Sequence, residues 1–166
     1  MLVIEAINDA LDQVATAAED ANITVNTHFP QGEDVLVYAD LELLTSALQN
    51  LLENAIRYSD SGGQVDITLR ENDNVVIEVA DNGIGISEED QKRIFERFYR
   101  VDPARSRSTG GTGLGLSIVK HVVSDLNGSI HVNSKPGEGA TFTIILPRHI
   151  PNTTQTDQIT LTKEEQ

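Results

Sequence analysis

The chain has 166 residues, of which 39% are hydrophobic and 23% are charged. This size and composition are typical of one globular domain, and they exclude collagen, a coiled coil and a wholly disordered chain. No apolar run approaches the roughly 18 residues that span a bilayer, and the start lacks the features of a signal peptide. The absence of cysteine excludes disulfides, a thiolate nucleophile and a Cys-ligated metal. A cytoplasmic location without direct membrane contact fits these features.

The formal net charge of −14 results from 12 basic and 26 acidic residues. Such an acidic chain lacks the basic field with which proteins bind nucleic acid non-specifically. Residues 1–56 contain ten acids and no Lys or Arg. Half of the basic residues fall between positions 92 and 107, namely Lys92, Arg93, Arg97, Arg100, Arg105 and Arg107. This cluster predicts either a solvated helix and loop or a site for a small polyanion.

Some segments have apolar residues at helical spacing, such as Ile7, Leu11 and Val14. Between them lie segments in which apolar and polar residues alternate, as in a β-strand. The first half therefore predicts, in order, a helix over residues 5–20, strands over 22–29 and 35–38, a helix from the N-cap Asp40 to about residue 58, and a hairpin of strands over 65–70 and 75–80.

The second half predicts a short helix that begins at Ser87 and reaches residue 95 or beyond, a loop over 101–112, a helix over 114–126, and strands over 129–134 and 140–146. The composition becomes polar after Pro147. Residues 1–150 are therefore expected to form one domain, and residues 151–166 a disordered tail. Helices that alternate with paired strands predict a two-layer α/β sandwich.

The helix around residue 50 has two different faces. Leu44 and Leu48 belong to an apolar stripe that can pack on a sheet. Asn50, Asn54 and Arg57 are spaced i, i+4 and i+7, and so they share another face. This polar face indicates either a solvated helix surface or a binding site.

Two glycine-rich segments adjoin predicted elements. Residues 81–85 (DNGIG) follow a strand and predict either an Asx-Gly turn or a close backbone approach to a ligand. Residues 110–116 (GGTGLGL) lead into a helix, where backbone N–H groups and the helix dipole suit a phosphate. This segment is not a Walker A loop, because Lys120 lies a turn inside the helix. It also does not open a βαβ unit, as a dinucleotide fingerprint requires.

A fourth segment, residues 137–142 (GEGATF), is a turn into a strand. In this order and spacing, the four segments resemble the ATP-binding catalytic domain of bacterial sensor histidine kinases, and PhoR-type kinases in particular. The matching motifs are the N box at 49–59 (QNLLENAIRYS), the G1 box at 81–85, the F box at 95–100 (FERFYR), the G2 box at 111–116 and the G3 turn at 137–142. The resemblance covers residues 43–147 and implies a Bergerat-type fold, with a mixed, mostly antiparallel sheet and helices on one face.

The resemblance implies that ATP is the ligand and assigns residues to its base. The carboxylate of Asp81 would accept a hydrogen bond from the adenine amino group, and Thr141 would support the same edge of the base. Gly83 and Gly85 would let the backbone approach the base, with Ile86 beside them.

The resemblance also implies a Mg²⁺ site and phosphate contacts. Asn54 would bind Mg²⁺ through its amide oxygen with Asn50 beside it, which suits the preference of Mg²⁺ for oxygen ligands. Arg57 stands where the family often has lysine, and either cation can meet a phosphate. The further residues implied to contact the nucleotide are Tyr58, Tyr99, Arg100, Arg105 or Arg107, Gly111, Thr112, Gly113, Leu114, Gly115 and Leu116. The implied catalytic set is Asn50, Asn54, Arg57 and Arg100, which would act by positioning and by neutralising charge.

The phosphoryl acceptor in this family is a histidine followed by Glu or Asp and then by Thr-Pro. His28, His121, His131 and His149 all lack that context. The chain is therefore expected to be the catalytic half of a kinase. Its expected partners are a separate dimerisation and histidine-phosphotransfer domain and, downstream, a response regulator.

Three other functions are open for this motif set. ATP-hydrolysing relatives carry a Glu general base four residues before the metal-binding Asn, where this chain has Asn50, which cannot take a proton from water. Glu53 is expected on another face of the helix, and it would therefore be a poor substitute for the missing general base. A non-catalytic nucleotide-sensing module would keep the same nucleotide contacts. An anti-sigma serine kinase would lack the F box and the long loop after it.

Overall fold

The computed structural model describes residues 1–101 and 113–151. Its elements are α1 (Val3–Asp20), β1 (Thr24–His28), α2 (Leu41–Arg57), β2 (Gln64–Glu71), β3 (Asn74–Asp81), α3 (Glu88–Gln91), α5 (Gly115–Asp125), β4 (Ser129–Ser134) and β5 (Ala140–Pro147). The loop predicted before α5 falls almost entirely outside the described residues, as does the predicted tail.

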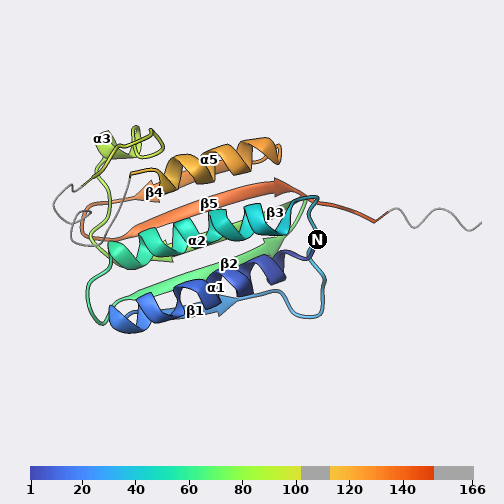
Figure 1. The fold of residues 1–166 in the computed structure, drawn as a ribbon, viewed down its shortest axis with the longest axis horizontal. Helices are drawn as coiled ribbons and strands as arrows, with labels where there is room; N and C mark the ends of the chain where they lie inside the picture. The colour runs from blue at the N-terminus through green and yellow to red at the C-terminus, as the bar shows by residue number, and fades with distance from the viewer. Residues whose placement is uncertain (102–112, 152–166) are drawn as a thin grey trace, which may run out of the picture.

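The five strands of this region form one mixed sheet in the order β1-β2-β3-β5-β4. β1 runs parallel to β2, and the other neighbouring strands are antiparallel. α1, α2 and α5 lie side by side across one face of the sheet (Figure 1). Along β2, β3 and β5, buried side chains alternate with more exposed ones, because only one face meets the helices. The predicted two-layer sandwich with a mostly antiparallel sheet is confirmed.

The face of the sheet away from the helices carries polar pairs. Arg70 of β2 and Glu78 of β3 form an ion pair at 2.6 Å, and His28 of β1 lies 3.0 Å from Asp66 of β2. These side chains are partly exposed to solvent. These two pairs thus lie on a solvated face of the sheet.

α2 joins the core to the polar face predicted around residue 50. Its N-cap Asp40 accepts a hydrogen bond from the Leu43 N–H at 3.1 Å, as predicted. The apolar stripe is fully buried, with Leu44, Leu48, Leu51 and Leu52 at 0% exposure. The polar face, consisting of Asn50, Asn54 and Arg57, is only partly buried. The predicted separation of the two faces is confirmed.

The strand predicted over residues 35–38 is wrong. Leu36 forms only an isolated bridge with Leu2. The neighbouring backbone bonds run from the Val3 N–H to the Val35 carbonyl and from the Val37 N–H to the Met1 carbonyl. The segment is thus extended, but it pairs with the few residues before α1, which are too short to form a ladder.

The helix that begins after Ser87 is shorter than predicted. Ser87 caps it by accepting from the Asp90 N–H at 3.2 Å, but α3 ends at Gln91. Irregular turns follow, and Phe98 adopts a left-handed φ of 63°, which cannot continue an α-helix. The Phe98 N–H donates instead to the Gly113 carbonyl at 2.8 Å. The segment that was predicted to continue the helix instead contacts the residues that precede α5.

Other boundaries agree with the predictions to within two residues. α1 begins at Val3, β1 is shorter at both ends, and β2 and β3 each extend one residue further at each end. No helix among the described residues is long and apolar enough to cross a membrane.

Candidate functional site

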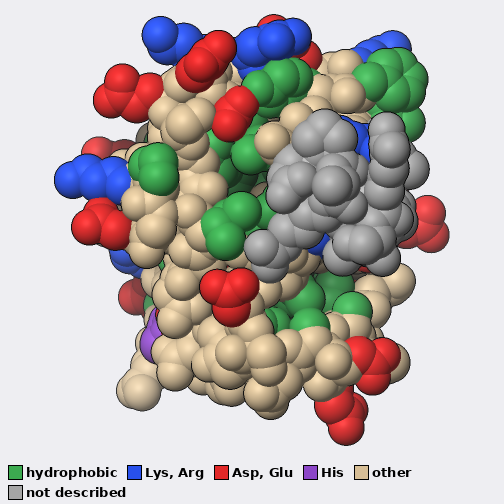
Figure 2. Space-filling view, turned by 90° about the vertical axis from the view of Figure 1, so that its left-hand side faces the viewer, with side chains coloured by type: hydrophobic (Ala, Val, Ile, Leu, Met, Phe, Trp, Pro, Cys, Tyr) green, Lys and Arg blue, Asp and Glu red, His purple; other side chains and the backbone are tan. Residues whose placement is uncertain are grey.

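A cavity of about 240 Å³ lies where α2 and β3 end and α5 begins. Its lining residues are Asn50, Glu53, Asn54, Arg57, Tyr58, Asp81, Gly85, Ile86, Ile94, Tyr99, Arg100, Val101, Gly113, Gly115, Leu116, Ile118 and Ala140. Figure 2 shows this end of the molecule, where hydrophobic side chains lie in a hollow and Lys and Arg side chains gather along the upper edge. Segments far apart in the sequence thus contribute to one site.

Most of the residues predicted from sequence line this cavity. They are Asn50, Asn54, Arg57, Tyr58, Asp81, Gly85, Ile86, Tyr99, Arg100, Gly113, Gly115 and Leu116. Gly83, Leu114 and Thr141 are described but do not line it. The assignments to Arg105, Arg107, Gly111 and Thr112 lie outside the described residues.

One wall of the cavity is the polar face of α2. Asn50, Asn54 and Arg57 follow one another along it toward the end of the helix. A Cβ at Gly115 would lie 3.3 Å from the Asn50 Oδ1 atom, which is tighter than an ordinary contact. Glycine therefore lets the first residue of α5 approach this wall closely.

Asp81, the last residue of β3, supplies a carboxylate at the other end of the cavity. Its Oδ1 atom accepts a hydrogen bond from the Gly83 N–H at 2.9 Å. Burial raises the pKa of Asp81 above its ordinary value, and the nearby backbone N–H groups of Gly83 and Ala140 oppose the rise. The result is an oriented, partly desolvated hydrogen-bond acceptor.

Glycines let the loops around Asp81 pack against other backbone segments. Gly85 has a φ of 72°, and a Cβ there would overlap the Lys135 carbonyl oxygen. A Cβ at Gly83 would overlap the Tyr58 carbonyl oxygen, which also accepts from the Ile84 N–H at 3.1 Å. Gly83 thus serves the close packing of this loop on the end of α2, whereas Gly85 reaches the cavity itself.

The register of β5 contradicts the expectation that Thr141 supports the edge of the base that Asp81 would bind. Ala140 pairs with Asp81, whereas Thr141 pairs with Ala80. Successive strand residues point to opposite faces, so Ala140 lines the cavity and Thr141 lies on the face away from the helices. The sequence carried a signal for this, because Phe142 and Ile144 share the parity of Ala140.

The structure also corrects the expectation for Glu53, whose side chain lines the cavity. A residue three positions after Asn50 lies only about 60° around the helix from it, and a long side chain can span that difference. The Glu53 Oε1 atom accepts a hydrogen bond from the Gln49 Nε2 group at 2.9 Å. Sequence reasoning also missed the apolar lining residues Ile94, Val101 and Ile118, whose spacing gave no signal beyond core packing.

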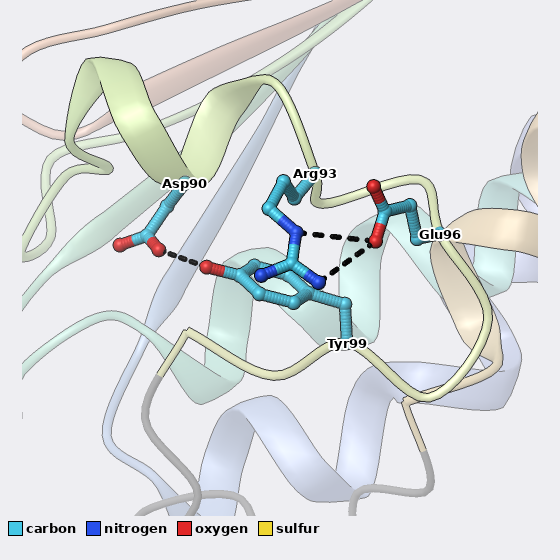
Figure 3. A network of polar contacts seen from close by, with 4 residues as sticks. All are labelled: Asp90, Arg93, Glu96 and Tyr99. Carbon is cyan, nitrogen blue, oxygen red and sulfur yellow. Dashed lines mark hydrogen bonds and ion pairs between the residues drawn. The ribbon is translucent and has the colours of Figure 1, made fainter.

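Tyr99 and Arg100 line the cavity from the segment after α3. Figure 3 shows the polar contacts that hold Tyr99: its hydroxyl donates to Asp90 of α3, and Arg93 lies over its ring at 4.5 Å from the centroid. Arg93 also forms an ion pair with Glu96 at 3.1 Å. The hydrogen bond to Asp90 raises the pKa of Tyr99.

The N-terminus of α5 forms the remaining wall. Gly113, Gly115 and Leu116 line the cavity there, and no side chain caps the helix. Backbone N–H groups and the positive end of the dipole at a helix N-terminus attract anions. Gly113 has a φ of 75° and packs against the backbone of Phe98. The F box segment and the start of α5 thus meet at the cavity.

All four histidines lie away from this cavity. His28 is in β1, His131 in β4 and His121 in α5, as predicted, and His149 follows β5. His28 and His131 bond to the neighbouring side chains of Asp66 and Ser129. The expectation that these histidines are structural is consistent with these positions.

The lining chemistry fits a nucleotide with a divalent cation. A partly buried carboxylate at one end suits an amino group of a base, and the two arginines with the α5 N-terminus suit phosphates. No cluster of three His, Cys, Asp or Glu side chains in the described ranges could hold a metal by itself. The amide oxygen of Asn54 could hold a Mg²⁺ ion whose coordination is completed by phosphate oxygens and water. Fold and site together define a nucleotide-binding domain.

Residues 39–150 match the family of histidine kinase-, DNA gyrase B- and HSP90-like ATPases. The sensor-like histidine kinase SenX3 of Mycolicibacterium smegmatis is 49% identical over 144 residues, which are 86% of this chain and 37% of SenX3. The chain therefore spans little more than a third of the length of that relative.

Solved structures show the same fold. The mycobacterial sensor histidine kinase MprB superposes with a TM-score of 0.77 at 30% identity, over 90% of this chain and 96% of that chain. Full-length ShkA in complex with AMPPNP superposes with a TM-score of 0.73 at 28% identity, over 87% of this chain and 30% of that chain. The chain belongs to the histidine kinase-, DNA gyrase B- and HSP90-like ATPase family, as a sensor histidine kinase catalytic domain. Membership of this family implies that it binds ATP.

Proposed function

We propose that this domain binds Mg-ATP and donates the γ-phosphoryl group to a histidine on a separate dimerisation and histidine-phosphotransfer domain. A response regulator would receive the group next, in two-component signal transduction. The observation that carries the proposal is the convergence of Asn54, Asp81, Arg57 and the α5 N-terminus on one cavity. The similarity to SenX3, a sensor-like histidine kinase, and to ShkA, solved with AMPPNP, supports it.

Each end of the cavity has a role in this proposal. Asp81 accepts from the adenine amino group and thereby fixes the base. Asn54, with Asn50 beside it, holds Mg²⁺ through an amide oxygen, and the bound ion supplies neutralisation of phosphate charge. Arg57, Arg100 and the first backbone amides of α5 orient the phosphates. These residues position and neutralise the transferred group, which is the main catalytic requirement of an in-line phosphoryl transfer.

The nucleophile must come from another domain. His28, His121, His131 and His149 all lie outside the cavity lining and lack the sequence context of a phosphoacceptor. We therefore assign the acceptor to the dimerisation domain of the same kinase. In this assignment the described domain is the cytoplasmic part of a membrane-anchored kinase and touches the membrane nowhere itself.

An ATPase is the competing function, because Glu53 lines the cavity and is a carboxylate. Its Oε1 atom is held by the Gln49 side chain, and Asn50 occupies the position of the general base in hydrolysing relatives. Among the described residues, a general-base role for Glu53 would therefore have to compete with this hydrogen bond. A nucleotide-sensing module without catalysis would show binding and no transfer.

The experiment is phosphoryl transfer from radiolabelled Mg-ATP to a supplied dimerisation domain. We expect the 166-residue chain alone to bind ATP, to hydrolyse it slowly and to label itself negligibly, and we expect label on the added domain. Strong self-labelling that is stable to base and labile to acid would instead reveal a phosphoacceptor histidine in this chain. Fast hydrolysis that Glu53→Gln abolishes would favour the ATPase, and binding without any transfer would favour the sensing module.

A further inference from the structure

A groove of about 820 Å³ lies between α1 and the first half of α2, separate from the cavity that Asn54 and Asp81 line. The two helices lie side by side on one face of the sheet (Figure 1). The residues that line the groove are Asp9, Asp12, Gln13, Leu41, Glu42, Thr45, Ser46 and Gln49. None of them lines the other cavity. The groove is within the size range of small-molecule sites.

The groove carries negative charge that no basic residue balances. Its three acids, Asp9, Asp12 and Glu42, are exposed and form no ion pair within the described part of the chain. Residues 1–56 contain no Lys or Arg. Asp9 and Asp12 are three residues apart on α1 and are therefore neighbours on its surface, where like charges repel each other. A bound cation would relieve this repulsion.

Thr45 carries an unsatisfied polar group beside these acids. It lines the groove with only 8% of its surface exposed. Its hydroxyl oxygen is buried and forms no hydrogen bond with any described residue. Buried hydroxyls usually have a partner, because a hydroxyl without one has lost its bonds to water with nothing in exchange. A ligand in the groove that donates a hydrogen bond would supply that partner.

The other side chains of the groove also favour a hydrogen-bond donor. Ionised carboxylates only accept hydrogen bonds. Gln49 uses its Nε2 group to bond to Glu53 at 2.9 Å, and its amide oxygen is left as an acceptor. Leu41 is the single large apolar residue of the lining, so a protein segment would find little apolar surface on which to anchor. The lining therefore suits a small cation with several N–H donors.

A metal ion fits this lining less well than an organic cation. Within residues 1–101 and 113–151, no group of three His, Cys, Asp or Glu side chains could hold a metal. A linear polyamine has several ammonium groups separated by methylene chains, so each of the separate carboxylates can accept from a different ammonium group. Its methylene groups can lie against Leu41, as the stems of long cationic side chains lie on apolar surface.

We propose that the groove between α1 and α2 binds a linear polyamine. The carboxylates of Asp9, Asp12 and Glu42 accept hydrogen bonds from its ammonium groups, and the Thr45 hydroxyl provides a further acceptor. The site shares no lining residue with the cavity assigned to ATP. The proposal therefore does not depend on the function proposed for that cavity.

The test is calorimetric titration of the nucleotide-free 166-residue chain with spermidine at low ionic strength. The wild-type chain should bind one molecule of spermidine. The triple variant Asp9→Asn/Asp12→Asn/Glu42→Gln should bind it about tenfold more weakly, because three partly solvated charge pairs are lost.

A matched control removes the same charge from exposed acids that do not line the groove. It is the triple variant Glu33→Gln/Asp34→Asn/Asp73→Asn. Its affinity for spermidine should differ from that of the wild-type chain by less than about twofold, since these charges act only from a distance through solvent. Equal losses in the two triple variants would overturn the proposal, because binding would then follow net charge alone.

Thr45→Val tests the hydroxyl, because valine keeps the shape of the side chain. Spermidine affinity should fall about threefold, as for one lost hydrogen bond. The unfolding midpoint of the free protein should stay the same or rise, because the hydroxyl bonds to nothing there. Thr45→Ser keeps the hydroxyl and should retain the wild-type affinity. A Thr45→Val variant that binds spermidine as tightly as the wild-type chain would contradict the assignment of Thr45.

Competition experiments distinguish a polyamine from other cations. Displacement of spermidine by an equal concentration of Mg²⁺ would overturn the proposal in favour of a general counterion site. A lysine-rich peptide that binds more tightly than spermidine, and only when the three groove acids are present, would overturn it in favour of a protein segment. Should the groove variant fail to unfold cooperatively, an NMR titration of the wild-type chain replaces it. The amide shifts should then be confined to residues 9–13 and 41–49, and shifts spread over the whole surface would contradict a defined site.

Discussion

The two ends of the cavity are built in different ways. At the end around Asp81, where the proposed function places the base (the base end), backbone groups bond to one another: the Ile84 N–H donates to the Tyr58 carbonyl, and the Gly137 N–H to the Ile84 carbonyl. Glycines at Gly85 and Gly139 allow these segments to approach. At the end around Arg57 and Arg100, where the proposed function places the phosphates (the phosphate end), Tyr99 is held by the side chains of Asp90 and Arg93. Arg57 and Arg100, the cations assigned to the phosphates in that proposal, have long and flexible side chains.

This difference matches what each part of a nucleotide needs. A flat base presents few polar atoms, and recognising it requires acceptors fixed in advance. Phosphates carry charge over many oxygens, so cations on long side chains can meet them in several arrangements. Substitutions at the base end should therefore act through the fold and affect all adenine nucleotides. Those at the phosphate end should discriminate between nucleotides and leave the fold intact.

The largest expected effect is that of Gly85→Ala. The left-handed φ of 72° and the overlap with the Lys135 carbonyl should together lower the free energy of unfolding by about 2–4 kcal/mol. Gly137 is the matched control, because it has a φ of 80° and no atom within 4 Å of an added Cβ. Gly137→Ala should cost about 1–2 kcal/mol. Urea unfolding measures both variants, and equal losses would show that the overlap at Gly85 has no consequence.

Asp81→Asn should weaken the binding of ATP and ADP alike. The Gly83 N–H already holds one carboxylate oxygen, so the amide oxygen of asparagine should take that place and its NH₂ should face the donor of the base. Such a mismatch costs about 1–3 kcal/mol, or roughly ten- to a hundredfold in affinity. Calorimetry with both nucleotides measures it. An unchanged affinity in a folded variant would exclude Asp81 as the base acceptor.

Asn54→Ala tests the phosphate end. Removal of an amide ligand to Mg²⁺ should weaken Mg-ATP binding roughly tenfold and Mg-free ADP binding less than about twofold. The unfolding midpoint should barely move, because Asn54 is partly exposed and lies off the apolar stripe of α2. Titrations with and without Mg²⁺ supply the comparison. A loss of the same size for both ligands would contradict a metal role.

A smaller effect should follow from the raised pKa of Asp81, which burial causes. The ionised carboxylate is the better acceptor, and a raised pKa means that protonation begins at a higher pH than for an ordinary aspartate. Affinity for ADP should therefore fall as the pH is lowered through that raised pKa, and rise again on return. In the Asp81→Asn variant the phosphates of ADP titrate as before, but the fall in ADP affinity caused by protonation of Asp81 should be absent. Identical pH profiles for the two proteins would count against the assignment.

The smallest effect is expected for Tyr99→Phe, which removes the bond to Asp90 and keeps the ring that lines the cavity. Because this bond lies near the surface, ATP affinity should fall by at most about threefold, with no change in thermal stability. Arg148, which pairs with Glu71 far from the cavity, provides a control in Arg148→Gln. A loss as large as that of Asp81→Asn would show that the phosphate end is as firmly built as the base end.

Local patterns in the sequence determined the parts that depend on neighbouring residues. Helical spacing predicted the buried stripe and the polar face of α2, and alternation predicted the β2–β3 hairpin. Asp40 and Ser87 were recognisable as the N-caps of α2 and α3. The four segments, in their order and spacing, were enough to predict a nucleotide site through their resemblance to histidine kinase catalytic domains. These features are local because caps, turns and periodicity act over a few residues.

The tertiary structure decided what depends on partners far along the chain. Pairing of Asp81 with Ala140 turned Thr141 away from the cavity, and the Phe98 bond to Gly113 ended the predicted helix early. The contact between Ser134 and Ile86 joins residues 48 positions apart. A one-residue choice of strand register moves every side chain to the other face. The parity of Ala140, Phe142 and Ile144 indicates which side chains share a face, but the pairing of Ala140 with Asp81, and so the place of that face beside the cavity, is decided only by the packed sheet that buries Phe142.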